Sequence, residues 1–543
     1  MEIRQIEGKL VDIIGGSISP GILTIQHGII QKITRQKSNS GPYLIPGFID
    51  AHVHIESSML VPAEFARLAV VHGTVATISD PHEIANVLGI SGVQYMINNI
   101  KDVPFKCYFG APSCVPATSF ETSGAKIDSN QIELLLANPD VHYLAEMMNW
   151  PGVIHGDQEV MRKIQCAAKY HKPVDGHAPG VTGDNIKKYV EAGISTDHEC
   201  SSIEEALEKL PLGMKILIRE GSAARNFNAL IPLLPEYADK VMFCSDDLHP
   251  DSLVKGHINL LVQRAVANGI DPLIALRVAS KNPIDHYNLD VGLLQEGDPA
   301  DLVTVENLTD FNVLQVFING HPVAKNNKTL IPRKTTTRPN NFMTSSKTPQ
   351  DFSIKASGNK LRVMIAEDGQ LITKQKITYP KIDQGMVISD TDRDILKIVV
   401  VNRYRETPPQ IGFVQNFGLK QGAIASSVAH DCHNIIAVGV EDRYLCAAVN
   451  EIIAHKGGVA AVSPSEQKTL PLPVAGLMSD QNGYQLAEDY ITVDALAKSM
   501  GSKLDAPFMT LSFMALLVIP ELKLSDLGLF NGTDFKFESL FVD

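Results

Sequence analysis

The chain carries no excess of positive charge. Its 543 residues include 61 acidic and 48 basic side chains, which gives a formal net charge of -13. Proteins bind nucleic-acid backbones through basic side chains that displace counterions, so this balance argues against a nucleic-acid partner. The chain also lacks an apolar run of about 18 residues that would span a bilayer, and its first residues lack the apolar core of a signal peptide. We therefore expect a cytoplasmic protein that binds neither nucleic acid nor membrane.

Paired cysteines are missing as well. The seven cysteines are scattered, and no Cys-x-x-Cys occurs. Their odd number and wide spacing indicate reduced thiols rather than a disulfide framework or a structural zinc site.

Strand-like and helix-like segments alternate between residues 44 and 290, a pattern typical of parallel α/β structure. Eight apolar strand candidates in about 250 residues fit the size of a TIM (β/α)8 barrel. A doubly wound sheet is the alternative, but no Gly-x-Gly-x-x-Gly or Walker-type loop follows any candidate strand. The candidates are residues 44–54, 74–79, 106–113, 143–148, 173–177, 195–198, 215–219 and 241–245.

Short β-like segments separated by Gly and Pro flank this region. We predict that residues 1–43 and 291–345 are two halves of one small split β-sandwich, with the barrel (44–290) inserted between them. Residues 327–350 are rich in Thr, Ser, Lys, Asn and Pro, which is typical of an exposed connection. Residues 346–543 are then a separate C-terminal α/β domain.

Two histidines, His52 and His54, end the first candidate strand. Side chains two positions apart on a strand share a face, so both imidazoles can reach one metal ion. Taken alone, such a pair more often consists of hydrogen-bonded structural histidines. Further ligand types stand at the ends of other candidate strands, however: Glu146 on the fourth, His177 on the fifth, His198 on the sixth and Asp246 on the eighth.

Together these six residues predict a metal centre, because TIM-barrel sites lie at the carboxyl ends of the strands. Four imidazoles and two carboxylates suffice for two divalent ions, with Glu146 between them. Asp246 can ligate one ion and also accept a proton from its water. Ligands without a thiolate suit Mn²⁺, Fe²⁺ or Zn²⁺. Cys244 is expected one layer deeper in the barrel, as a packing residue.

These residues resemble those of the amidohydrolase superfamily, whose motif is shared by residues 46–54 together with His177, His198 and Asp246. Within it, the resemblance to the bacterial-type adenine deaminase family runs over nearly the whole chain. One departure is Cys432, where the family pattern has serine or another small residue. The more particular motifs are residues 54–60, 80–89, 145–149, 174–179, 428–434 and 475–480.

The resemblance implies a binuclear barrel in which Glu146 occupies the place that other members fill with a carbamylated lysine. It also implies hydrolysis of adenine to hypoxanthine and ammonia, a reaction of purine salvage and adenine catabolism. On this hypothesis a metal-bound hydroxide attacks C6 of adenine and Asp246 carries its proton to the departing amine. A second acid protonates a ring nitrogen, and Glu83 is the candidate.

The predicted substrate-binding residues surround this acid. The segment from Asp80 to Glu83 follows the second strand, and the alternative interpretation is that it only caps the next helix. Residues just after His54 can contact the base or the metal ligands, and His430 can close over the barrel mouth or form a local turn. The predicted substrate-binding set is Asp80, His82, Glu83, Glu56, Ser57 and His430.

Two other functions stay open. The same metal site can open a cyclic amide or deaminate guanine or a pterin. A barrel that lost catalysis and serves as a scaffold is the second alternative, but it would not need six ligands at one face. A cytidine-type deaminase is excluded, because no Pro-Cys-x-x-Cys follows the His-x-Glu of residues 54–56. We expect a small-molecule partner and a homo-oligomer, taken to be a homodimer.

Overall fold

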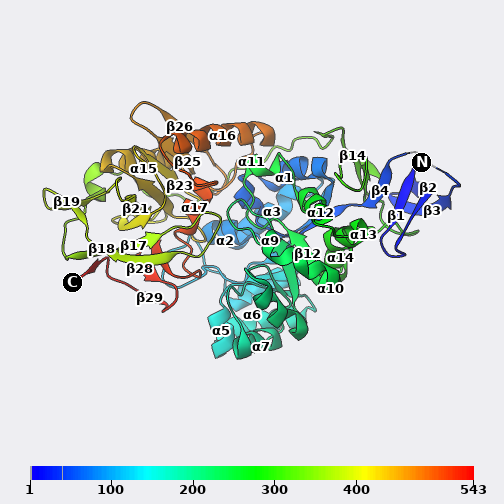
Figure 1. Ribbon diagram of the computed structural model, residues 1–543, viewed down its shortest axis with the longest axis horizontal. Helices are drawn as coiled ribbons and strands as arrows, with labels where there is room; N and C mark the ends of the chain where they lie inside the picture. Colours follow the sequence, from blue (N-terminus) through cyan, green and yellow to red (C-terminus); the bar gives the residue numbers. More distant parts are fainter. Residues whose placement is uncertain (1–2, 39–40) are drawn as a thin grey trace.

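The structure, a computed structural model, describes residues 3–38 and 41–543; the predicted segment 1–43 also includes residues 1–2 and 39–40, which lie outside the described residues. Three regions follow one another along the long axis: a β-region that holds the N-terminus, a barrel, and a C-terminal region (Figure 1). Within the described ranges, no helix combines the length and apolar character that crossing a membrane requires.

Eight parallel strands form the barrel. They pair in the orders β5-β6-β7-β8-β9 and β10-β11-β12. Parallel bridges from Val174 to Ile194 and from Val53 to Asp246 join the two groups at both ends, so the ring closes. This confirms the predicted TIM-barrel fold class. The strands are β5 (Phe48–Val53), β6 (Thr74–Ser79), β7 (Lys106–Ala111), β8 (Val141–Met147), β9 (Val174–Gly176), β10 (Thr196–Asp197), β11 (Lys215–Arg219) and β12 (Val241–Cys244).

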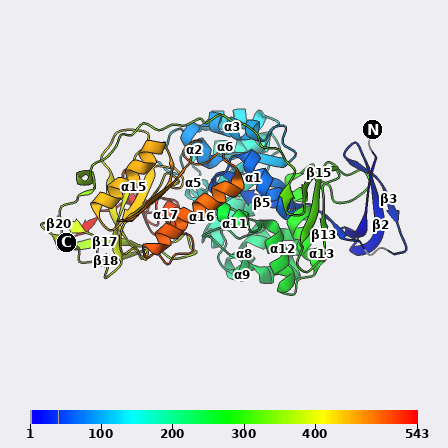
Figure 2. The same ribbon diagram turned by 90° about the horizontal axis from the view of Figure 1, so that it is seen from above.

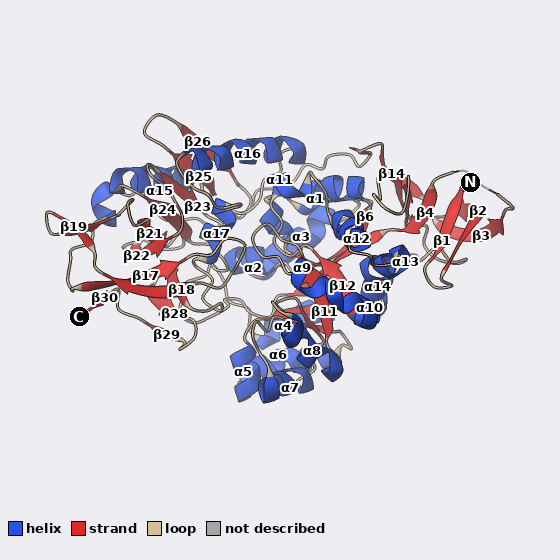
Figure 3. Cartoon of the chain, viewed as in Figure 1, coloured by secondary structure: helices blue, strands red, loops and turns tan. Residues whose placement is uncertain are grey.

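Helices surround the barrel strands and bury one face each (Figure 3). In α6, for example, Val160, Ile164 and Ala167 are buried at helical spacing, and the Asp157 side chain caps the first turn. The helices are α1 (Pro62–Ala69), α2 (His82–Leu88), α3 (Ile90–Ile100), α4 (Ser129–Ala137), α5 (Trp150–His155), α6 (Gln158–Lys169), α7 (Gly183–Glu191), α8 (Ile203–Lys209), α9 (Phe227–Leu230), α10 (Leu234–Tyr237), α11 (Pro250–Leu253), α12 (Ile258–Ala267), α13 (Pro272–Leu276) and α14 (Asn282–Tyr287).

One sheet of eight strands joins segments from both sides of the barrel, in the order β16-β15-β14-β13-β4-β1-β2-β3. The predicted strand 44–54 therefore divides at Gly47: β4 belongs to this sheet and β5 to the barrel. A Cβ on Gly47 would lie 2.3 Å from Val75 Cγ2, so the crossing requires glycine. The strands are β1 (Arg4–Asp12), β2 (Ser17–Gln26), β3 (Ile29–Arg35), β4 (Tyr43–Pro46), β13 (Leu302–Val305), β14 (Val313–Ile318), β15 (His321–Lys325) and β16 (Lys328–Thr329).

The C-terminal region is built on a nine-stranded mixed sheet, β18-β17-β22-β21-β24-β23-β25-β26 with β30 beside β17. Its strands are β17 (Lys360–Ile365), β18 (Lys374–Thr378), β21 (Ile395–Val401), β22 (Gln410–Gln415), β23 (Ala423–Ser426), β24 (Ile435–Gly439), β25 (Gly458–Val462), β26 (Gln467–Pro471) and β30 (Phe541–Val542). Smaller sheets pair β19 (Lys381–Asp383) with β20 (Met386–Ile388), and β27 (Leu522–Ser525) with β28 (Gly528–Asn531) and β29 (Lys536–Phe537).

Three helices accompany this sheet: α15 (Asp442–His455), α16 (Gly483–Ser499) and α17 (Pro507–Phe513). Helix α16 reaches from the C-terminal sheet to the barrel, where it packs on α1 and α11 (Figure 2). Direct hydrogen bonds cross the same boundary, among them Asn434 Nδ2 to Thr122 O at 2.9 Å and Thr122 N to Asp526 Oδ1 at 2.8 Å. The C-terminal region is thus docked on the barrel.

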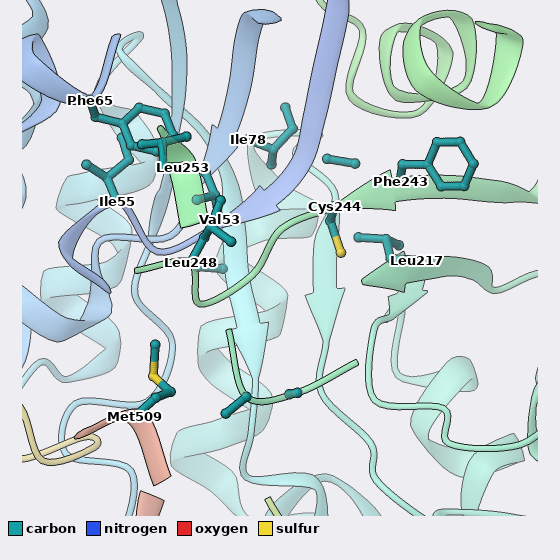
Figure 4. Close-up of a cluster of buried hydrophobic side chains, with 14 of the residues drawn as sticks. Val53, Ile55, Phe65, Ile78, Leu217, Phe243, Cys244, Leu248, Leu253 and Met509 are labelled. Atoms are coloured by element: carbon teal, nitrogen blue, oxygen red, sulfur yellow. The ribbon is translucent and has the colours of Figure 1, made fainter. Parts of the chain in front are cut away.

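An apolar cluster lies beneath the carboxyl ends of the barrel strands. Val53, between the two histidines of β5, belongs to this cluster together with Leu217 and Cys244 (Figure 4). Burial raises the pKa of the Cys244 thiol well above its usual value. Cys244 is therefore a packing residue in this structure, as its position along β12 predicts.

Candidate metal centre and active site

The first group of candidate ligands lies at the ends of β5 and β12: His52 is in β5, His54 follows its last residue, and Asp246 is the second residue after β12. His52 Nε2 and His54 Nε2 are 3.1 Å apart, and Asp246 Oδ1 lies 3.5 Å and 3.2 Å from them. Backbone hydrogen bonds fix this arrangement, because Asp246 N donates to His52 O and His54 N donates to Asp246 O. The three side chains are therefore positioned by the closure of the barrel itself.

The second group comes from the fourth, fifth and sixth barrel strands. Glu146 Oε2 lies 2.9 Å from His177 Nδ1 and 3.2 Å from His198 Nε2. Its other oxygen, Oε1, is 3.4 Å from His54 Nε2. Glu146 thus stands between the two groups, which is the bridging position that the sequence predicts for it.

The chemistry of this donor set fits divalent cations. Each of the six side chains is at most 4% exposed. In the described part of the chain, the ring nitrogens His52 Nδ1 and His177 Nε2 are buried without a hydrogen-bond partner, although buried polar atoms are normally paired. Imidazole and carboxylate donors without a thiolate suit Mn²⁺, Fe²⁺ or Zn²⁺, so the cluster can hold metal ions of this kind.

An arginine and a glutamate that the sequence analysis did not select border the metal cluster. Arg219, the last residue of β11, places Nη1 2.7 Å from Asp246 Oδ2 and Nη2 2.9 Å from Glu199 Oε2. Burial raises the pKa of Asp246, but the guanidinium of Arg219 outweighs this effect and holds that pKa well below its usual value. Glu199 Oε1 is also 3.4 Å from His198 Nε2, so it is a further possible ligand.

Two carboxylates share one serine on the other side of the cluster. Ser57 Oγ lies 2.9 Å from Glu83 Oε1 and 2.5 Å from Asp247 Oδ1. Ser57 has a single hydroxyl hydrogen and can donate it to only one of them, so the other carboxyl needs a proton of its own. Burial raises the pKa of Glu83. The shared hydroxyl and the raised pKa both favour the protonated form of Glu83. Asp247 was not selected in the sequence analysis.

His430 of the C-terminal region faces the same carboxylates. Its Nδ1 lies 3.6 Å from Glu83 Oε1, and its ring stacks on Phe513 with centroids 4.7 Å apart. Burial lowers the pKa of His430, but the carboxyl groups around its ring raise that pKa above its usual value. Its backbone N donates to Ser512 O, which holds the segment against α17. The structure thus brings His430 and Glu83 together from separate domains.

His82 links the barrel to the C-terminal region. Its Nδ1 lies 3.1 Å from Asp80 Oδ2 and 3.5 Å from Glu146 Oε1, while its Nε2 lies 3.5 Å from Asp431 Oδ1. Asp80 Oδ1 also accepts a hydrogen bond from the backbone N of His82, the first residue of α2, whose N-cap is Pro81. The same turn places the His82 ring beside Glu146.

Glu56 has a different environment from the other predicted residues. Its Oε1 accepts a hydrogen bond from Ile84 N in the first turn of α2. Like Ser57, Asp80 and Glu83, it is not among the residues that line the cavity beside the metal ligands. In this structure Glu56 therefore caps a helix.

The cavity beside the metal ligands, called here the catalytic cavity, has a volume of about 20 Å³. Its polar wall consists of barrel ligands together with Asp247, His430 and Asp431. Its apolar wall consists of Met148, Leu371, Phe513 and Leu516, three of which belong to the C-terminal region. An apolar wall opposite a polar one suits a flat aromatic ring with polar edges.

Two family models match the chain. The amidohydrolase family model matches residues 43–323, and the adenine deaminase C-terminal domain model matches residues 370–536. The catalytic cavity lies where these two matched segments meet, since Asp246 belongs to the first and Leu371 to the second.

Curated relatives resemble the chain over its whole length. It is 54% identical to the adenine deaminase of Sulfurovum sp. (strain NBC37-1) over 98% of this chain and 99% of that protein. It is 52% identical to the adenine deaminase of Salinibacter ruber, with 99% of each chain covered. It is 50% identical to the adenine deaminase of Methanosarcina mazei, with 100% of each chain covered.

Proposed function

This chain belongs to the adenine deaminase family of amidohydrolases, and on that premise we propose that it hydrolyses adenine to hypoxanthine and ammonia. Adenine is a flat, neutral base, which suits a cavity with one apolar and one polar wall. The net charge of -13 fits a neutral substrate better than a phosphorylated one. The reaction belongs to purine salvage and adenine catabolism.

Enzymes of the amidohydrolase family are metal-dependent, and we propose that two divalent ions, Mn²⁺ or Fe²⁺ before Zn²⁺, occupy the cluster. The proposed ligands are His52, His54, Glu146, His177, His198 and Asp246. Such a pair of ions lowers the pKa of water and makes hydroxide available near neutral pH. The remaining chemistry is supplied by side chains.

Asp246 is the proposed proton carrier. Arg219 binds Oδ2 and leaves Oδ1 directed at the two histidines of β5, so the carboxylate is ionised and oriented before substrate arrives. It accepts one proton from the attacking water and delivers it to the exocyclic nitrogen as the bond from C6 to that nitrogen breaks. The amine then leaves as ammonia.

Glu83 is the proposed acid that protonates a ring nitrogen. The shared Ser57 hydroxyl and the raised pKa of Glu83 both favour its protonated form. Protonation prevents negative charge from accumulating on the purine when oxygen adds to C6. Glu83 recovers its proton when the new hydroxyl becomes the carbonyl, so one water proton ends on ammonia and the other on the ring. Ser57, Asp80, His82 and His430 are proposed to position the base.

One observation carries this proposal: beside one buried ligand cluster, Arg219 binds Asp246 Oδ2, and Glu83 shares the Ser57 hydroxyl with Asp247. The test is to load separate samples with Mn²⁺, Fe²⁺ or Zn²⁺ and to follow adenine loss and ammonia release. We expect equal amounts of hypoxanthine and ammonia. Turnover of guanine, a pterin or a cyclic amide with none of adenine would assign the other reaction instead.

The assembly is part of the proposal too. We propose a cytoplasmic homodimer with a small-molecule substrate, and the molar mass from light scattering tests the dimer.

A further inference from the structure

The catalytic cavity is too small for the proposed substrate. A volume of about 20 Å³ holds roughly one water molecule, and a purine is far larger. The candidate metal ligands are all buried around this small space. Substrate binding therefore requires part of the cavity wall to move.

A second, larger space lies directly outside this wall. It has a volume of about 190 Å³ and is called here the outer cavity. The residues that line both cavities are Glu199 and Leu371, so these two side chains form the partition between them. The outer cavity lies between barrel loops, such as the one with Asn226, and C-terminal loops that contain Ile372 and Pro520.

The barrel side of the partition is fixed. Both oxygens of Glu199 are bound by the guanidinium of Arg219, which also binds Asp246. Displacing Glu199 would leave buried charges without their partners, which is costly. The movable side of the partition is therefore Leu371.

Leu371 is held in a manner that allows a swing. It lies in the loop between β17 and β18, which turns at Gly369 with φ +72°. The loop is anchored where it ends, because Thr373 N donates to Pro520 O at 3.0 Å. The side chain of Leu371 is apolar and only 7% exposed, so its displacement breaks no polar contact of that side chain.

A buried lysine holds the backbone of Leu371 in place. Lys523 Nζ donates to Leu371 O at 2.7 Å and to Phe513 O at 3.0 Å. Leu371 and Phe513 both belong to the apolar wall of the catalytic cavity. The side-chain nitrogen of Lys523 therefore fixes the distance between the backbones of these two residues. Lys523 is fully buried, and its two acceptors are carbonyl groups.

We propose that the outer cavity is the access site for a flat heteroaromatic amine, that Leu371 is the gate to the catalytic cavity, and that Lys523 positions this gate. The chemical class of the ligand rests on the proposed function, whereas the gate does not. Ile372 and Pro520 offer apolar contacts to ring faces, and the exposed Gln370 offers a polar edge. The same gate must pass water and metal ions, because the ligand cluster lines the inner cavity.

Metal loss to a chelator tests the gate without any assay of activity. In metal-loaded protein mixed with excess chelator, Leu371→Ala removes the partition and should speed metal loss by about tenfold or more. Leu371→Trp should slow it by a similar factor. Lys523→Met, which leaves the Leu371 side chain intact, should speed it by a smaller factor. Rates equal to wild type in Leu371→Ala and Leu371→Trp would overturn the proposal.

Steady-state kinetics supply the second readout. Leu371→Trp should lower kcat/KM for adenine by about tenfold or more at unchanged metal content, because access precedes every chemical step. Ile382→Trp is the matched control: Ile382 is 51% exposed on β19, at the far end of the C-terminal region (Figure 1), and the same substitution there should change neither rate.

The outcomes separate the gate from the function. If wild-type protein does not deaminate adenine, the proposed function fails, and the chelator rates still decide the gate. If adenine is turned over and both Leu371 variants match wild type in chelation and in kcat/KM, substrate enters elsewhere. Should Leu371→Trp fail to fold, Leu371→Ala decides alone, since faster metal loss at an unchanged melting temperature is not produced by unfolding.

Discussion

The barrel side and the C-terminal side of the catalytic cavity are built differently. On the barrel side, His52, His54 and Asp246 stand at strand ends whose backbones are hydrogen-bonded to each other. On the C-terminal side, His430 and Leu371 stand on loops, and each is held by one neighbouring segment, α17 or Lys523. Ligand geometry thus rests on the barrel and access on the loops, a division common in enzymes.

This difference shows which side chains of the site can be displaced without loss of their role. Metal ligation and proton transfer fail when an atom moves by a fraction of an ångström, so they require strand ends. A cover over the substrate must move in order to work, so loops serve it better. If this division is correct, substitutions on the barrel side should cost much more turnover than substitutions on the C-terminal side.

The largest effect is expected for Asp246→Asn. The amide keeps the shape and an oxygen ligand but cannot accept the water proton, so kcat should fall by about 10³- to 10⁴-fold. Metal content, measured by elemental analysis, should stay near that of wild type. Asp246→Asn with wild-type turnover would remove Asp246 from proton transfer.

Glu83→Gln should cost less, about 10²- to 10³-fold in kcat, because only the acid is lost. Glutamine fills the same space and can still bond to Ser57. Ser57→Ala is the companion variant, since it leaves the acid in place and removes only its neighbour. An equal loss in both variants would indicate that the pair acts through geometry and not through the proton of Glu83.

Asp431→Asn tests the C-terminal side directly. Asp431 lines the catalytic cavity and lies 3.5 Å from His82, which in turn faces Glu146. Partners that orient such groups typically contribute about 10- to 100-fold, and we expect a loss of kcat/KM in that range. Asp80→Asn, on the barrel side of the same histidine, is the matched comparison. A loss as large as that of Asp246→Asn would contradict the expectation that the C-terminal side of the cavity contributes less to turnover than the barrel side.

The smallest effect concerns stability. Burial lowers the pKa of Lys523 from about 10.5 to about 7. Between these values the unfolded chain binds a proton that the folded chain has released, so wild-type stability rises with pH across this range. Lys523→Met removes this contribution. The melting temperature of the variant minus that of wild type should therefore be greatest near pH 7 and should decrease toward pH 10. A difference that does not change with pH would contradict the lowered pKa of Lys523.

The candidate metal ligands could be selected from the sequence because each is an imidazole or carboxylate at the carboxyl end of a predicted strand. His177 and His198 are of this kind. Arg219 has the same signal, since it is the last residue of a predicted strand, and it could have been found. Leu371 and Phe513 could not have been found from the sequence. An apolar residue that lines a cavity between two regions has the same sequence signal as an apolar residue of the core, and only the docked structure separates the two.

The sequence pattern also did not reveal that the predicted strand 44–54 divides into β4 and β5. Both β4 and β5 are fully apolar on at least one face, so the hydrophobic pattern continues through Gly47 without interruption. Only the approach of Val75 to Gly47 in three dimensions shows that the chain changes sheets there. Similarly, Glu56 has the residue type of a ligand, and its use as a helix cap depends on where α2 begins.

The pairing of β4 with β13 places the two ends of the barrel side by side, with Pro46 opposite Leu302. The chain therefore leaves the outer sheet at β4, forms the barrel and returns to the same sheet at β13. The hydrogen bonds between β4 and β13 are called here the anchor. Tension applied along the backbone passes across the hydrogen bonds of this anchor before it reaches any barrel strand. The pairing of β4 with β13 thus holds the two ends of the barrel together without any contribution from the candidate metal ligands.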